Sequence, residues 1–101
     1  EHHQVTQTSI VNDMKNSIHY ITNTCFVKKF NSGVDDEEFD YHYDKNSRFI
    51  KVLEDSDWLF QFTGEQPKKM IKGTVIHVSR LVQHKMIQGT TNLTVQVLEV
   101  L

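Results

Sequence analysis

Alanine is absent from this sequence, and cysteine, proline and glycine are scarce. The 101 residues contain one cysteine, one proline and four glycines. Because alanine is the best helix former, while the plentiful Val, Ile and Thr prefer pleated surfaces, this composition favours strands. The single thiol, Cys25, excludes an internal disulfide and a zinc site built from thiolates. A lone cysteine is typical of a buried thiol in a reducing compartment, so we expect a cytoplasmic or nuclear protein.

The sequence also lacks an excess of positive charge and a long apolar run. Its formal net charge is −2 at pH 7, whereas domains that bind nucleic acid by neutralising phosphates usually carry a basic excess. No apolar stretch approaches the roughly 20 residues that a membrane-spanning helix needs. We therefore expect no membrane association, and we treat nucleic-acid binding as an alternative that net charge does not favour.

The apolar and aromatic residues that are present suffice for one core. Hydrophobic residues make up 38% of the sequence and aromatic residues 10%, which is typical of globular rather than disordered chains. A chain of this length is too short to build two cores. We predict a single domain over residues 1–101, in which the first few residues can be disordered.

Periodicity predicts one helix followed by about six strands. Apolar residues spaced by three and four predict an amphipathic helix over residues 4–22. Alternating apolar and polar residues predict strands over residues 23–30, 39–44, 49–54, 58–62, 74–82 and 93–101. In the second strand, Phe39, Tyr41 and Tyr43 share a face that should be buried. The last two strands are joined through Gly89 and should form an antiparallel hairpin.

These elements predict an α+β fold that is mainly β. Short connections leave no room for crossover helices, so the strands should form a five- to six-stranded antiparallel curved sheet or a small, partly open barrel. The runs KGTVIHVSRL and LTVQVLEV resemble strand pairs of oligonucleotide-binding barrels. The helix followed by a meander is similar to cystatin-like domains. Since the cystatin hairpin motif QxVxG is absent, that resemblance implies a fold and not protease inhibition.

No group of residues in the sequence indicates catalysis, a metal or a cofactor. The spacing of His19, His42, His77 and His84 does not force three or four of them to converge, as a zinc site requires. Cys25 has no nucleophile signature beside it, and the isolated glycines cannot cradle a phosphate. We therefore predict no catalytic residue, no metal ligand and no cofactor, and we expect that the chain is not an enzyme.

The strands, sheet edges and aromatic residues favour a noncatalytic protein–protein interaction or dimerisation module, a scaffold subunit of a larger intracellular assembly. Its partner would be another protein or a second copy of the chain. The residues predicted to contact the partner are Tyr41, Tyr43, Trp58 and Phe60. The same rings could instead fill the core.

Two alternatives stay open. An oligonucleotide-binding barrel would bind single-stranded nucleic acid, with Lys72, Arg80 and Lys85 contacting the backbone and aromatic rings stacking on bases. A cystatin-like helix-on-sheet domain would instead hold a small apolar ligand.

Overall fold

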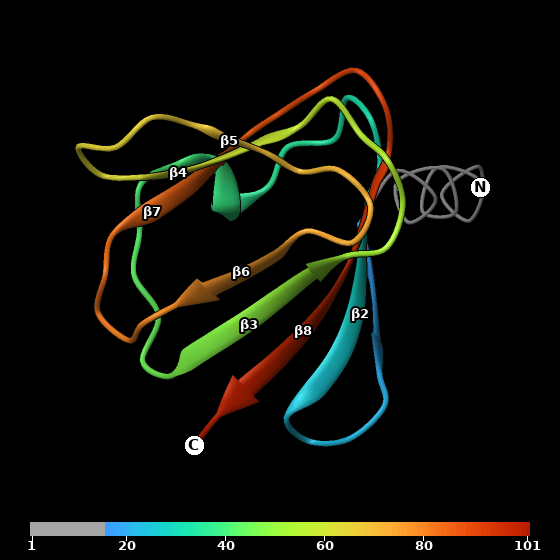
Figure 1. The fold of residues 1–101 in the computed structure, drawn as a ribbon. Helices are drawn as coiled ribbons and strands as arrows, with labels where there is room; N and C mark the ends of the chain where they lie inside the picture. The colour runs from blue at the N-terminus through green and yellow to red at the C-terminus, as the bar shows by residue number, and fades with distance from the viewer. Residues whose placement is uncertain (1–15) are drawn as a thin grey trace, which may run out of the picture.

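In a computed structural model, which describes residues 16–101, the chain forms two antiparallel sheets around one core. The five-stranded sheet has the order β1-β2-β8-β3-β6, and the three-stranded sheet has the order β5-β4-β7. Figure 1 shows β2, β8, β3 and β6 side by side, with β4, β5 and β7 grouped apart from them. The strands are β1 (Ser17–Tyr20), β2 (Cys25–Phe30), β3 (Ser47–Val52), β4 (Leu59–Phe62), β5 (Lys68–Lys69), β6 (Val75–Val78), β7 (His84–Ile87) and β8 (Leu93–Val100).

Strand β8 is the centre of the five-stranded sheet. It pairs antiparallel with β2 on one side and with β3 on the other. Leu93, Val95 and Val97 are buried, and the residues between them are partly exposed, as expected for a strand with one face on the core. The alternation seen in the sequence over residues 93–101 therefore corresponds to an actual strand.

The core lies between the two sheets and is rich in aromatic rings. Trp58 is fully buried, and its ring centroid lies 5.5 Å from that of Phe30 and 5.6 Å from that of Phe39. Trp58 Nε1 donates a hydrogen bond to the carbonyl oxygen of Thr91 at 2.6 Å. A buried indole needs such an acceptor, so Trp58, the residue before strand β4, is bonded to the loop before β8.

The predicted α+β fold class was wrong, because the described residues form an all-β fold. Of the helix predicted over residues 4–22, the described part contains β1, which pairs with β2, and residues 4–15 lie outside the described residues. The spacing of Ile18 and Ile21 suited a helix, but pairing with the edge of β2 satisfies the backbone of this segment and fixes it as a strand. Within residues 16–101 no helix is long and apolar enough to cross a membrane.

The predicted hairpin between the last two strands was also wrong. Strands β6 and β8 belong to the same sheet, but β3 lies between them. After β6 the chain turns through Leu81, at a left-handed φ of 64°, and crosses to the other sheet, where β7 pairs with β4. This crossing places His84, the first residue of β7, deep in the core with 1% exposure.

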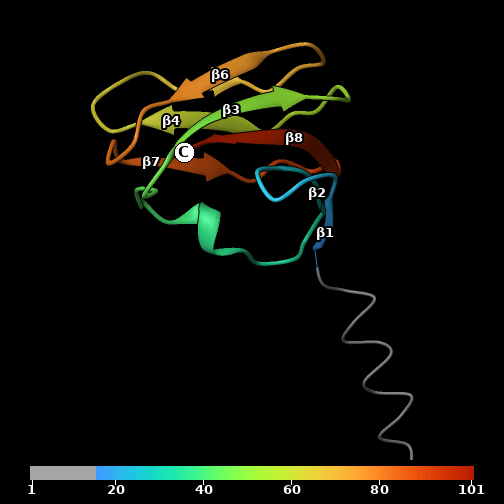
Figure 2. The same cartoon turned by 90° about the horizontal axis from the view of Figure 1, so that it is seen from below.

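Residues 39–44 do not form the predicted strand. The chain instead makes a short 3₁₀ helix, η1 (Glu37–Phe39), because the carboxylate of Asp36 accepts a hydrogen bond from the Glu38 N–H and caps this turn. Of the ring face expected to be buried, Phe39 packs against the core, while Tyr41 and Tyr43 are exposed. Figure 2 shows η1 beside β7 at one side of the sheets.

Candidate metal centre

The residues predicted to contact a protein partner do not share one surface. Trp58 and Phe60 are 0% exposed, whereas Tyr41 is 43% and Tyr43 59% exposed. The two buried rings fill the core. A partner that binds at this predicted site would therefore reach only the two tyrosines.

The residues predicted to contact nucleic acid lie in three different segments. Lys72 precedes β6 and Arg80 follows it, so they lie beyond opposite ends of that strand. Lys85 belongs to β7, and its Nζ lies 4.6 Å from the centroid of the Tyr41 ring. The structure thus brings Lys85 to a tyrosine predicted as a partner contact, and it leaves Lys72 and Arg80 in separate loops.

Three residues that the sequence did not connect meet beside η1: Glu38, His42 and His84. One potential ligand atom from each lies within 4.8 Å of the other two. Two backbone hydrogen bonds hold the histidines opposite each other, from His42 N–H to His84 O at 3.0 Å and from His84 N–H to His42 O at 2.9 Å. Their ring centroids are 4.3 Å apart, so a single bridge between a loop and β7 builds this cluster.

Asp36 positions the carboxylate of this cluster. It accepts hydrogen bonds from the Glu38 N–H at 3.0 Å and from the Asn16 side-chain amide at 2.8 Å, and its Oδ2 lies 3.0 Å from Lys28 Nζ. Burial alone would raise the pKa of Asp36, but these hydrogen bonds and the Lys28 charge together lower it. The ionised Asp36 therefore fixes the turn from which Glu38 extends toward His42.

Both imidazoles are held so that Nε2 is available as a metal ligand. His42 Nδ1 lies 2.8 Å from the carbonyl oxygen of Asp40, and His84 Nδ1 lies 2.9 Å from that of Val82. A carbonyl oxygen can only accept, so each Nδ1 donates and carries a proton. In the neutral ring the lone pair is then on Nε2, and a backbone carbonyl on Nδ1 is the usual outer partner of a metal-bound histidine.

Each Nε2 atom lies close to a carboxylate oxygen, but neither contact is a hydrogen bond. His42 Nε2 lies 3.1 Å from Glu38 Oε1, and His84 Nε2 lies 3.3 Å from Asp44 Oδ2. These distances suit ion pairs, but His42 Nε2 and Asp44 Oδ2 are buried without a hydrogen-bond partner among residues 16–101. Buried polar atoms left without a partner are costly. A cation bound by Glu38, His42 and His84 would give His42 Nε2 a partner.

Two histidines and a carboxylate are a common ligand set for transition metals. Zinc bonds of about 2.0–2.2 Å place neighbouring ligand atoms roughly 3.4 Å apart, so ligand atoms up to 4.8 Å apart would have to close by up to about 1.4 Å. Three protein ligands leave coordination positions for another molecule, which distinguishes catalytic from structural sites. Asp44 Oδ2 lies 3.3 Å from His84 Nε2, but Asp44 is outside the group whose ligand atoms all lie within 4.8 Å of one another.

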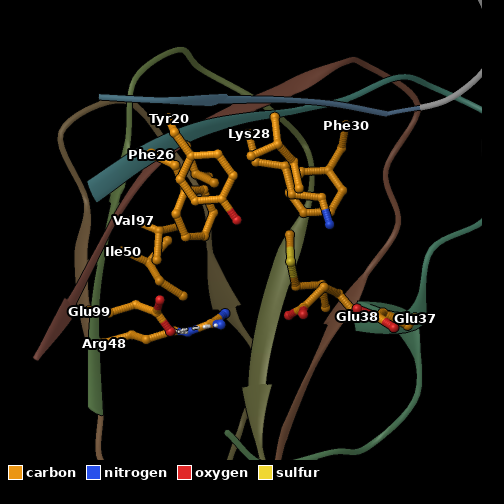
Figure 3. A pocket seen from close by; sticks show the side chains of 13 residues that line it. Tyr20, Phe26, Lys28, Phe30, Glu37, Glu38, Arg48, Ile50, Val97 and Glu99 are labelled. Carbon is orange, nitrogen blue, oxygen red and sulfur yellow. Dashed lines mark hydrogen bonds and ion pairs between the residues drawn. The ribbon is translucent and has the colours of Figure 1, made fainter. Parts of the chain in front are cut away.

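A pocket of about 210 Å³ adjoins the cluster and shares Glu38 with it. Figure 3 shows Phe26, Ile50 and Val97 along one side of this pocket, and Glu37 and Glu38 on η1 at the other. Arg48 lines both this pocket and a neighbouring hollow that contains His42 and Asp44. Glu38 and Arg48 therefore stand at the junction of the pocket and the candidate metal centre.

Known structures share this architecture at low sequence identity. A cupin-like protein from Thermotoga maritima matches with a TM-score of 0.61 and 17% identity, over 79% of this chain and 59% of that chain. An RmlC-like cupin with a double-stranded β-helix fold from Methanocaldococcus jannaschii matches with a TM-score of 0.62 and 14% identity, over 86% and 81%. The fold is cupin-like. It is neither the oligonucleotide-binding barrel nor the cystatin-like domain expected from the sequence.

A third neighbour in fold is a protein from Ralstonia eutropha described as a putative mannose-6-phosphate isomerase, with a TM-score of 0.62 and 13% identity over 84% of this chain and 83% of that chain. No protein-family model and no curated protein matches the sequence. These identities show the fold alone, and this chain spans 59% of the length of the Thermotoga protein.

The prediction that the chain is not an enzyme was wrong to exclude catalysis. A cupin-like fold is often that of an enzyme, and the Ralstonia neighbour is named a putative mannose-6-phosphate isomerase. In this chain Glu38, His42 and His84 lie close enough together to hold a metal ion. Sequence reasoning missed this group because its members come from two segments more than 40 residues apart. The available signals were the spacing of four between Glu38 and His42 and the alternation of His84 with the buried Met86.

Proposed function

We propose that this cupin-like protein binds a divalent transition-metal ion through Glu38, His42 and His84 and acts on a small organic molecule in the adjoining pocket. The observation that carries the proposal is the pair of imidazoles that donate from Nδ1 to backbone carbonyls while each Nε2 faces a carboxylate. A bound metal would supply Lewis-acid chemistry. Because a neighbour in fold is described as a putative isomerase, isomerisation is the first reaction class to assay.

The competing explanation is a pair of histidine–carboxylate ion pairs with no metal. It requires each imidazole to carry a second proton on Nε2 and to donate it to Glu38 or Asp44. The buried His42 Nε2 has no such hydrogen bond, which favours a bound cation. The two explanations also differ in what they predict for the protein in solution, since only the metal proposal predicts a saturable metal-binding site.

Isothermal titration calorimetry of chelator-treated protein with Zn²⁺, Mn²⁺ and Ni²⁺ tests the proposal, and one ion should bind per chain. A metal at about 100 times its Kd adds about 2.7 kcal/mol to the free energy of unfolding. At about 4–8 °C per kcal/mol for a domain of this size, the Tm should rise by roughly 10–20 °C.

Matched histidine variants locate the bound ion. His42→Ala should weaken metal binding by at least about 100-fold. His77→Ala is the control, because His77 is an exposed histidine in β6 that stacks on Phe49 outside the cluster. Wild-type protein that binds no ion, or a control that loses as much affinity as His42→Ala, would contradict the proposal.

An Asp44→Asn variant decides between three and four protein ligands. If the site keeps an open position for substrate, this variant should retain metal affinity within about tenfold. A loss as large as that of His42→Ala would make Asp44 a fourth ligand, and the site would then be structural rather than catalytic.

A second candidate function, association with a protein partner or a second copy, rests on the outer face of the five-stranded sheet. Strand register places His77, Phe49, Leu98 and Cys25 in one row across β6, β3, β8 and β2. Phe49 and Leu98 are 41% and 43% exposed, and exposed apolar patches mark interaction sites. Sedimentation equilibrium should show a dimer that Phe49→Ser dissociates; a monomeric wild type would exclude self-association.

A further inference from the structure

The pocket beside the candidate metal centre has the size and chemistry of a site for one class of small molecule. We propose that it takes an uncharged, hydroxyl-bearing ligand of about monosaccharide size. Its volume of about 210 Å³ is smaller than the roughly 300–1,000 Å³ of pockets that hold drug-sized ligands. The pocket can therefore enclose a small metabolite, whereas a nucleotide or a peptide would extend into solvent.

One side of the pocket is apolar and partly open to solvent. Phe26 and Ile50 are buried beneath it, and the ring centroids of Tyr20 and Phe26 lie 5.2 Å apart. Tyr20 is 62% exposed, although it lines the pocket. A ligand with an apolar face could cover this ring, and the C–H face of a cyclic polyol is such a surface.

Both cations in the pocket already have anionic partners. Lys28 Nζ lies 3.0 Å from Asp36 Oδ2, and Arg48 donates from Nε and Nη2 to Glu99 Oε2 at 3.3 and 3.2 Å. An ionised phosphate or carboxylate on the ligand would need a cation without a partner to offset its loss of water. The lining residues offer no such cation, so only the proposed metal ion would attract an anionic group.

The proposed metal ion decides against a cationic ligand, because it offsets the charge of the carboxylates on η1. This step rests on the proposed function. Glu37 and Glu38 line the pocket, and without a metal their charge would attract an amine. A divalent ion bound to Glu38 offsets that charge, and the charges of the ion, Lys28 and Arg48 are together balanced by those of Glu37, Glu38, Glu99 and Asp36. The metal-loaded pocket is then close to neutral, and an uncharged ligand fits it best.

The paired charges match the hydrogen-bonding pattern of hydroxyl groups. A guanidinium has five N–H donors, of which Glu99 receives two from Arg48. The carboxylate of Glu99 beside it can accept, so adjacent groups offer a donor and an acceptor. Hydroxyl groups both donate and accept, and neighbouring hydroxyls on one ring can therefore bind to both members of this ion pair.

Calorimetric titration of the Zn²⁺-loaded full chain with four probes tests this inference. The probes are methyl α-D-glucopyranoside, glucose 6-phosphate, glucosamine and phenol, which represent the uncharged hydroxylated, anionic, cationic and apolar classes. The uncharged glucoside should bind most tightly. Tightest binding of any other probe, or no binding of the glucoside at millimolar concentrations, would overturn the inference.

Two variants connect the result to the pocket. Tyr20→Ala should weaken glucoside binding about tenfold, whereas Tyr41→Ala, an exposed tyrosine outside the pocket lining, should leave it unchanged. Glu99→Gln removes the closer of the two carboxylates paired with Arg48, since Asp44 lies 3.8 Å from Nη1, and should shift the preference toward glucose 6-phosphate by about tenfold. Zn²⁺ binding is measured in the same samples. If the wild-type protein binds Zn²⁺ but not the glucoside, only this inference is overturned and the proposed function stands.

Discussion

Replacing Trp58 with alanine tests most sharply whether the aromatic residues predicted as partner contacts belong to the core or to a surface. Trp58 is 0% exposed, packs against Phe30 and Phe39, and donates a hydrogen bond to the Thr91 carbonyl. Tyr43 was predicted to have the same role but is 59% exposed. The two alanine variants should therefore behave differently.

The magnitudes follow from burial. Truncating a buried tryptophan costs about 3–5 kcal/mol of the free energy of unfolding, whereas a surface substitution usually changes it by less than about 0.5 kcal/mol. With a urea m-value of about 2 kcal/mol/M, Trp58→Ala should lower the urea midpoint by roughly 2 M. Tyr43→Ala should leave the midpoint within roughly 0.3 M of the wild type.

Far-UV circular dichroism is the assay, because it does not depend on the fluorescence of the tryptophan that is removed. Trp58→Phe serves as a milder variant: it keeps a ring in the core but loses the bond to Thr91, at a cost of about 1–3 kcal/mol. The reasoning fails if Trp58→Ala and Tyr43→Ala have the same midpoint, since Trp58 could not then be a core residue.

Two further predictions concern the loop before β8. Gly89→Ala should lower stability by about 1–3 kcal/mol, measured by thermal denaturation, because a Cβ there would overlap Asp57, whose backbone carbon lies 2.8 Å away; an unchanged Tm would contradict this. Hydrogen bonds from the Thr90 side chain and the Thr91 N–H lower the pKa of Asp57 from 3.8 to about 2. The ionised Asp57 therefore contributes to the free energy of unfolding above pH 3.8, and this contribution is lost as pH falls through about 2. Asp57→Asn should lack this acid-dependent loss, and an acid titration identical to wild type would refute it.

Most of the strands could be predicted from alternation, but their pairing could not. The run from Leu93 to Val100 and the run from Cys25 to Phe30 alternate clearly and form strands. Alternation shows which face of a strand is buried and not which strand lies beside it. The hairpin predicted through Gly89 was therefore a guess about topology, and β3 in fact lies between β6 and β8.

Local hydrogen bonds explain why residues 39–44 were mispredicted. Their period of two was regular, but Asp36 caps a 3₁₀ turn at Glu37–Phe39, and within the predicted strand only His42 pairs, with His84. The aromatic face expected inside is thus largely outside. The polar residues His42 and Asp44, expected outside, approach the candidate metal centre instead.

The candidate metal centre was beyond sequence reasoning because it depends on that one bridge. His84 meets His42 only after the chain crosses between sheets near Leu81. Residues 84–87 would have been predicted as a strand if His84 had been treated as a core residue that alternates with Met86, since both are buried in β7. Even then, nothing in the spacing of the two histidines predicts that a loop residue faces the first residue of β7.

The most direct test of the metal proposal is a crystal structure of the protein grown with Zn²⁺, with anomalous diffraction measured at the zinc absorption edge. The proposal predicts one anomalous peak about 2.0–2.2 Å from Nε2 of His42, Nε2 of His84 and a carboxylate oxygen of Glu38. The proposal would be contradicted if the map has no peak at these three residues and the protein also binds no zinc in solution.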